Sequence, residues 1–185
     1  MMASLNNNFT IVSFNARGTN QGDIVLNQLC NDLMPCVIFI QEHWLSSVNS
    51  DILLNFSVHY VCFFSSSMDK IVSTGILRGR PFGGVAIMIR NDLVTRASLV
   101  AKSDRMIIVL LGDILLVNIY ASSANCTDEK TLINTDLLSV IDEALENFNA
   151  DYRLVIGGDF NTDLRNQCKT TSLFKNFFPA TQLVH

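Results

Sequence analysis

Short apolar runs separated by polar turns dominate the chain, and their spacing predicts a sheet-rich fold with a few helices. Several runs, such as residues 37–40 and 106–111, are apolar at every position, and strands of this kind need cover on both faces. Gly112-Asp113 separates two of the runs and predicts a type II′ hairpin turn. The strands predicted in this way span residues 9–14, 36–41, 59–64, 83–89, 93–101, 106–111, 114–120 and 153–156.

Apolar residues at three- and four-residue spacing predict helices over residues 23–34, 132–148 and 171–178. Pro35 is expected to end the first of them. These helices are too few to cover both faces of one large parallel sheet. Two β-sheets packed face to face, with helices outside, satisfy the pattern better. We therefore expect an α/β (α+β) fold built as a sandwich of two mixed sheets flanked by helices.

Length and composition narrow the class of protein. The chain has 185 residues, a net charge of −4, 49% hydrophobic and 16% charged residues, which suits one globular domain and excludes a disordered protein. No apolar run approaches the roughly 18 residues of a membrane span, so no membrane partner is expected. The five scattered cysteines and the absence of a secretory signal in MMASLNNNFT predict free thiols in an intracellular protein, nuclear or cytoplasmic rather than secreted. Residues 1–8 are expected to form a disordered tail before a domain over residues 9–185.

Polar side chains follow four of the apolar runs at the point where each run ends. They are Asn15, Glu42, Tyr120 and, after two glycines, the pair Asp159 and Asn161. If these ends lie side by side, they form one polar pocket at the rim of an apolar core, and burial of that set without a ligand would be costly. The alternative for each residue alone is an ordinary turn or cap residue.

These five residues suit metal-assisted hydrolysis of a phosphoester. The Glu42 carboxylate and the Asn15 amide oxygen are hard ligands for Mg²⁺, with Mn²⁺ as the alternative. Asp159 would accept a proton from a water molecule, and Asn161 and Tyr120 would hydrogen-bond the phosphate. The predicted catalytic residues are thus Asp159, Asn161, Tyr120 and Asn15, and the predicted metal ligands are Glu42 and Asn15.

Three further residues are candidates for binding the substrate. Arg17 follows the first strand by three residues, and Arg80 precedes the glycine pair at 83–84. Both could contact a phosphate, and solvated loop charges are the alternative. His43 follows Glu42 and could contact a nucleotide, with a solvent-facing histidine as the alternative.

Five segments resemble, in their order, the endonuclease/exonuclease/phosphatase superfamily, which includes exonuclease III-like nucleases and DNase I. They are FNARG at 14–18, QEHWL at 41–45, GRPFGGVAI at 79–87, VNIY at 117–120 and GGDFNTD at 157–163. Within that superfamily, the five segments are most similar to the endonuclease domain of non-LTR retrotransposon proteins. The resemblance implies a four-layer DNase I-like sandwich, the residue roles given above, DNA as the substrate and a reverse-transcriptase domain in the parent polyprotein.

One part of the family pattern does not occur in these 185 residues. The family carries a Ser-Asp-His motif after the D-x-N motif, and no such sequence is present here. The resemblance therefore implies a partial domain, incomplete at its C-terminus. Besides a DNA endonuclease, two alternatives stay open: a phosphatase of the same fold acting on inositol phosphates or lipid head groups, and a non-catalytic fragment of a decayed retroelement.

Overall fold

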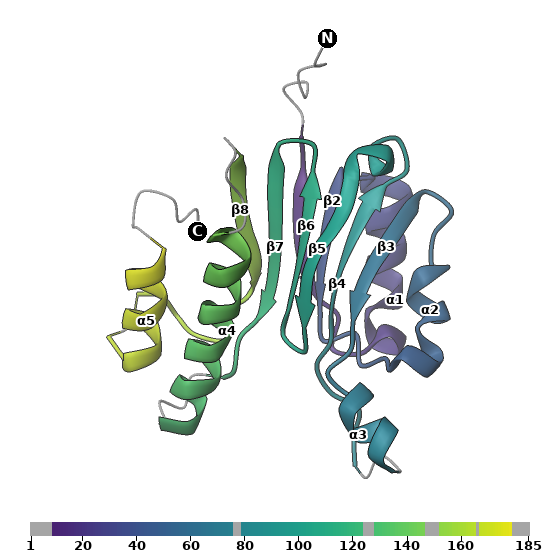
Figure 1. Cartoon of the computed structure of the whole chain (residues 1–185). Coiled ribbons are helices and arrows are strands. Elements are labelled where there is room, and N and C mark those ends of the chain that lie inside the picture. Colours follow the sequence, from purple (N-terminus) through teal and green to yellow (C-terminus); the bar gives the residue numbers. More distant parts are fainter. Residues whose placement is uncertain (1–8, 76–78, 124–127, 147–151, 166, 179–185) are drawn as a thin grey trace. The chain divides into compact units, whose positions relative to one another are not determined.

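The computed structural model describes residues 9–75, 79–123, 128–146, 152–165 and 167–178, and its strands form two sheets (Figure 1). The chain divides into two compact units. The first unit is Met1–Tyr120 together with Asp151–Gly158, and the second is Ala121–Ala150 together with Asp159–His185. The units are described one after the other below.

The first sheet has four strands in the order β1-β2-β4-β3. β1 and β2 run parallel, and β4 pairs antiparallel with both β2 and β3. Because β1 and β2 are parallel neighbours, their carboxyl ends reach the same edge of the sheet. The strands are β1 (Ile11–Asn15), β2 (Val37–Gln41), β3 (Tyr60–Ser65) and β4 (Val85–Arg90).

The second sheet has the order β5-β6-β7-β8. The hairpin between β6 and β7 is confirmed, and Gly112 has the positive φ (63°) that the first central position of a type II′ turn needs. The prediction for residues 93–101 was only partly right, because a 3₁₀ turn, η3 (Val94–Arg96), precedes the strand. The strands are β5 (Ala97–Ser103), β6 (Met106–Leu111), β7 (Ile114–Tyr120) and β8 (Arg153–Asp159).

The two sheets share one apolar core within the first unit. Phe39 and Ile87 of the first sheet belong to the same buried cluster as Ile107, Val109 and Leu116 of the second. Each of these side chains is at most 1% exposed. Burial of one such side chain contributes about 1.5–3 kcal/mol, so this core explains why the strands are apolar throughout.

Helices cover the other face of the first sheet (Figure 1). Leu26, Leu29 and Leu53 pack there against Ile38 and Met88. The first helix begins at Thr19, four residues earlier than predicted, and a short helix that the sequence analysis did not predict begins at Asp69. The helical elements in this part of the chain are α1 (Thr19–Gln28), the π-helix η1 (Leu29–Leu33), the 3₁₀ turn η2 (Ser47–Asn49), α2 (Asp51–Leu54) and α3 (Asp69–Thr74).

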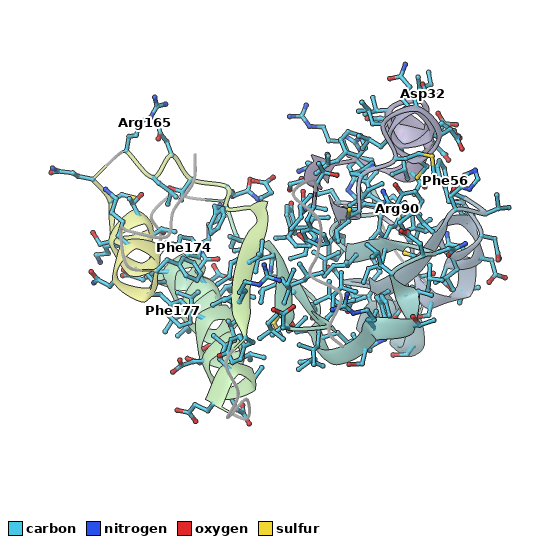
Figure 2. The ribbon with its side chains drawn as sticks, turned by 90° about the horizontal axis from the view of Figure 1, so that it is seen from above. Asp32, Phe56, Arg90, Arg165, Phe174 and Phe177 are labelled. Carbon is cyan, nitrogen blue, oxygen red and sulfur yellow. The ribbon has the colours of Figure 1, made fainter. Side chains whose placement is uncertain are left out.

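The second unit contains α4 (Asp128–Glu146) and α5 (Lys169–Phe177). The rings of Phe160, Phe174 and Phe178 pack on one another, with centroids 5.3–6.4 Å apart. Phe174 and Phe177 both come from α5 (Figure 2), and Phe174 is fully buried. This aromatic cluster packs α5 against the segment that follows β8. The predicted end of the α4 helix at Phe148 lies outside the described residues.

The predicted architecture of two mixed sheets flanked by helices is confirmed. The tail predicted over residues 1–8 lies outside the described part of the chain. Among the described residues, no helix is both long and apolar enough to cross a membrane.

Candidate functional site

Asn15 and Glu42 meet at the edge of the first sheet where β1 and β2 end. Asn15 is the last residue of β1 and pairs in register with Gln41, so the next residue, Glu42, emerges beside it. Asn15 Nδ2 donates a hydrogen bond of 2.8 Å to Glu42 Oε1. The amide oxygen of Asn15 accepts a bond of 3.1 Å from the Arg17 backbone N–H. The parallel pairing of β1 and β2 therefore brings together an amide and a carboxylate that are 27 residues apart in the sequence.

The backbone around Glu42 is strained. Arg17, Glu42 and Trp44 all have positive φ angles, of 49°, 54° and 57°. Positive φ is uncommon for residues other than glycine, and it persists only where surrounding bonds fix the chain. Here the Glu42 N–H donates to the Gly84 carbonyl at 2.9 Å, and the Glu42 carbonyl accepts from the Gly18 N–H at 2.7 Å. Strain of this kind concentrates at functional sites and supports such a role for this turn.

The surroundings of Glu42 fit a hard divalent cation. Its Oε2 accepts a bond of 3.3 Å from Trp44 Nε1, and its Oε1 accepts the bond from Asn15. Among the residues that the structure describes, no basic side chain forms an ion pair with Glu42, and no three His, Cys, Asp or Glu residues cluster as metal ligands. Mg²⁺ takes one or two carboxylates and completes its shell with water and phosphate oxygens, so a single partly buried carboxylate beside an amide suits it.

Tyr120 ends β7 in the same unit and is half-buried. The Arg105 guanidinium lies 5.5 Å from the centroid of the Tyr120 ring, and Arg105 Nη1 donates to the Tyr120 carbonyl at 3.3 Å. A Cβ atom placed on Gly83 would lie 4.0 Å from Tyr120 Cε1, and the Gly83 carbonyl accepts the Trp44 N–H. Tyr120 therefore lies beside the turn that also holds Trp44. Nothing in the sequence pattern pointed to the contact with Arg105.

The two arginine candidates differ in their surroundings. The Arg17 side chain is exposed, two residues beyond Asn15. Arg80 is also exposed, and its guanidinium lies over the Trp44 ring, 5.4 Å from the centroid, in a cation–π contact. Trp44 also donates to Glu42, so the same indole contacts both Arg80 and the predicted metal ligand.

The proposal that His43 contacts substrate is wrong for this structure, because the ring is fully buried. His43 Nδ1 accepts the Leu45 N–H at 3.0 Å, so Nε2 carries the proton and donates to the Ser65 carbonyl at 2.9 Å. Burial lowers the pKa of His43 to about 4, against the opposing effect of its backbone hydrogen bonds. The ring packs beneath Gly84, where any Cβ would overlap it. His43 thus supports the Glu42 turn from inside, and the expected solvent-facing alternative is wrong as well.

Asp159 and Asn161 lie in the second unit and bond to each other and to Ala121. Asp159 Oδ1 accepts the Asn161 N–H at 2.9 Å, and Asn161 Nδ2 donates to the Ala121 carbonyl at 2.9 Å. The Ala121 N–H donates to the Asp159 carbonyl at 2.8 Å. Asn161 has a positive φ of 50°, like the residues of the Glu42 turn. The D-x-N segment is therefore a defined turn with its two side chains held in place.

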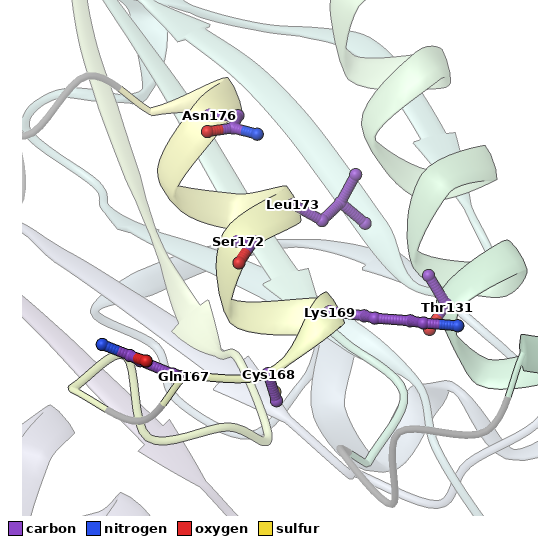
Figure 3. A pocket seen from close by; sticks show the side chains of 7 residues that line it. All are labelled: Thr131, Gln167, Cys168, Lys169, Ser172, Leu173 and Asn176. Atoms are coloured by element: carbon purple, nitrogen blue, oxygen red, sulfur yellow. The ribbon is translucent and has the colours of Figure 1, made fainter.

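A separate hollow of about 760 Å³ lies between α4 and α5 of the second unit (Figure 3). Its lining includes Thr131, Cys168, Ser172 and Asn176. None of the predicted site residues lines this hollow.

The chain matches no protein-family profile and no curated protein sequence. Solved structures do match it in fold. The 3′ phosphatase NExo from Neisseria, bound to a product DNA hairpin, superimposes with a TM-score of 0.56 and 18% identity over 83% of this chain and 59% of that one. For an AP endonuclease from Archaeoglobus fulgidus the TM-score is 0.62, with 16% identity over 90% of this chain and 68% of that one. For the AP endonuclease LMAP from Leishmania major it is 0.67, with 15% identity over 90% and 65%.

These similarities establish the DNase I-like fold. At such low identities they do not transfer an activity, and the chain spans only 59% of the length of the Neisseria protein. The chemistry must therefore be argued from the residues of this chain.

Proposed function

We propose that this chain belongs to the endonuclease/exonuclease/phosphatase superfamily and is a divalent-metal-dependent phosphodiester hydrolase that acts on DNA. The observation that carries the proposal is the Asn15–Glu42 pair, joined at 2.8 Å in a strained turn, where no basic side chain of the described part of the chain pairs with the carboxylate. The DNase I-like fold supports it, since the similar solved structures include two AP endonucleases and a 3′ phosphatase bound to DNA.

The proposed roles follow from the chemistry of each group. Glu42, with Asn15, would hold Mg²⁺, or Mn²⁺ in its place, and the bound ion would neutralise charge on the phosphate. Asp159 would accept a proton from the attacking water. The oxygen of that water would bond to phosphorus while the P–O ester bond to the leaving group breaks. Asn161 and Tyr120 would donate hydrogen bonds to phosphate oxygens, which gain charge in the transition state.

We also propose that the DNA backbone is bound through arginines. The chain is acidic overall, with a net charge of −4, so affinity for DNA must come from local positive charge and the metal. Arg80, fixed over Trp44, and the exposed Arg17 are the candidates for phosphate contacts.

As a finer assignment, we propose an endonuclease of the non-LTR retrotransposon type, with a reverse-transcriptase domain as its partner in the parent polyprotein. The support is the order of the five motifs in the sequence, from FNARG at 14–18 to GGDFNTD at 157–163. An open reading frame that links these motifs to reverse-transcriptase motifs would support this assignment. A genomic context with no such frame would contradict it.

The experiment incubates the purified chain with supercoiled plasmid and Mg²⁺ and follows conversion to the nicked form. We expect Glu42→Gln and Asp159→Asn to slow nicking by roughly 10²–10⁴-fold, because each removes a group that acts in the chemical step. Glu129→Gln is the matched control, since Glu129 is an exposed carboxylate at the start of α4 and should leave the rate unchanged.

Each other outcome contradicts part of the proposal. Nicking that persists in Glu42→Gln or in a chelator would indicate a contaminating nuclease. Release of phosphate from inositol phosphates, without nicking, would favour a phosphatase of the same fold. A folded chain with neither activity would favour the non-catalytic alternative.

A further inference from the structure

A buried polar network lies directly beneath the Glu42 turn and joins the two sheets of the first unit. Asn118 of β7 and Gln41 of β2 are 0% and 1% exposed, although both carry amide side chains. Gln41 Nε2 donates to Asn118 Oδ1 at 2.7 Å and to Ser13 Oγ at 3.2 Å. A buried amide is costly unless its hydrogen bonds are made, so each bond of this network matters to the position of its strands.

Asn118 is the centre of the network. Its Nδ2 donates to the Ile40 carbonyl at 2.9 Å and to the Ala86 carbonyl at 2.8 Å. Ile40 and Ala86 are paired across β2 and β4. One carboxamide from the second sheet therefore bonds to both residues of a cross-strand pair in the first sheet. Both N–H groups and the oxygen of Asn118 are therefore used to fix three strands relative to one another.

Two of these strands, β2 and β7, lead directly to a residue of the proposed site, and the third, β4, begins next to a glycine that bonds to it. Gln41 precedes Glu42, and Asn118 precedes Tyr120 by two positions, so Asn118 and Tyr120 project from the same face of β7. Ala86 follows Gly84 by two residues, and the Gly84 carbonyl accepts the Glu42 N–H.

A fourth strand also meets the network. A Cβ atom on Gly158 of β8 would lie 2.9 Å from Asn118 Oδ1 and would overlap the Ile119 carbonyl oxygen. The second glycine of the GGDFN segment is thus required for close packing on β7, beside the Asn118 carboxamide. β8 ends at Asp159, the next residue.

We infer that Asn118 is a positioning residue for the proposed hydrolase, holding the strand ends that carry Glu42 and Tyr120 in the geometry that binds the metal and the phosphate. The inference rests on the proposed function. It assigns no contact between Asn118 and the substrate. Removal of the network should therefore weaken metal binding and slow the chemical step, with little effect on phosphate contacts made by exposed arginines.

The chain provides a direct readout of metal binding. Trp44 is the single tryptophan, and its Nε1 donates to Glu42 Oε2 at 3.3 Å. A cation bound by Glu42 should change the environment of this indole. Titration of intrinsic fluorescence with MgCl₂ or MnCl₂ then gives a dissociation constant without any measurement of activity.

We expect Asn118→Leu to weaken the Mg²⁺ affinity of the full chain by roughly 10–100-fold, the range found for residues that orient metal ligands. The value of kcat for plasmid nicking should fall with it, while KM for DNA stays near that of the wild type. Tyr60→Phe is the matched control. Its hydroxyl is buried and donates to the Pro35 carbonyl at 2.6 Å, at the opposite end of β2, so the variant loses a buried bond without touching the site.

Gln41→Met is the second variant, and it decides the question if Asn118→Leu does not fold. It removes the amide of Gln41 and leaves the two backbone bonds of Asn118, so a smaller loss of Mg²⁺ affinity is expected. The double variant Gln41→Met/Asn118→Leu should bind Mg²⁺ no more weakly than Asn118→Leu alone, because the two residues act as one unit.

The outcomes separate the two claims. If the wild-type chain shows neither a fluorescence response to Mg²⁺ nor nicking, the proposed function fails. If the wild type responds and the network variants keep its affinity and kcat, as Tyr60→Phe should, the inference about Asn118 is overturned and the network serves stability alone.

Discussion

Replacement of Gly158 by alanine tests whether close packing between β7 and β8 is needed for the fold. Gly158 has a φ of 129°, a conformation that L-residues rarely adopt. An added Cβ would overlap the Ile119 carbonyl oxygen and lie 2.8 Å from the Ile119 nitrogen. These are backbone atoms of a central strand and cannot rotate away as a side chain could.

Two costs add in this variant. The strained backbone angle costs about 1–3 kcal/mol for a residue other than glycine. Forcing a methyl group into a packed interior costs about another 1–3 kcal/mol. A total loss of about 2–6 kcal/mol is a large part of the 5–15 kcal/mol that stabilises a typical domain.

Gly79→Ala separates these costs. Gly79 has a similarly positive φ of 102°, but a Cβ there would meet no atom within 4 Å. The control therefore measures the cost of the backbone angle alone. The entropy that alanine removes from the unfolded chain is common to both variants and cancels in the comparison.

The assay is urea unfolding followed by circular dichroism at pH 7. We expect Gly158→Ala to be less stable than Gly79→Ala by about 1–3 kcal/mol, seen as a lower midpoint at an unchanged m-value. Equal losses in the two variants would refute the reasoning, because the clash with Ile119 would then contribute nothing.

Three further predictions concern buried titratable groups and DNA binding. The pKa of His43 is about 4 in the folded chain and 6.5 in the unfolded chain. Its contribution of about 3 kcal/mol to the free energy of unfolding is therefore present above pH 6.5 and is lost as the pH falls toward 4. Urea unfolding at pH 7 and pH 4.5, with a chelator present, should show this loss as a lower midpoint at pH 4.5. The control His59→Gln should lose as much as the wild type. Equal midpoints of the wild type at the two pH values would contradict the prediction. Burial raises the pKa of Cys30 to about 11 and also raises that of Cys62. Both thiols should therefore react slowly with a disulfide reagent at pH 8 until urea unfolds the chain. Fast labelling of either cysteine in the folded chain, located by mass spectrometry, would disprove this. Arg80→Ala should weaken DNA binding and reduce the slope of log affinity against log salt by about 1, measured by fluorescence anisotropy, whereas an unchanged slope would argue against a phosphate contact.

Much of the strand framework could be predicted because its signal is local. The central strands are short apolar runs bounded by polar residues, as in Val37–Gln41 and Ile114–Tyr120. The start of α1 escaped prediction because its first turn, Thr19 to Gly22, contains no apolar residue. Gly22 is buried there against Ala16, a contact that periodicity cannot reveal.

The candidate site divides in the same way. Asn15 and Glu42 could be placed together from sequence because the ends of parallel neighbouring strands coincide, once parallel pairing is assumed. The burial of His43 could not be predicted from the sequence, because the ring packs beneath Gly84, a residue that is distant along the chain. Asn118 gave one signal, an amide inside an otherwise apolar strand, but its partners lie in the other sheet.

The positive φ of Glu42 has a consequence for how this chain responds to selection. A glycine at position 42 would relieve the backbone strain, so a screen that rewards thermal stability should enrich Glu42→Gly. A screen that rewards nicking should eliminate the same variant, since glycine carries no carboxylate. Position 42 is thus a site where the two screens would favour opposite residues, and a deep mutational scan scored both ways would identify it without reference to any relative.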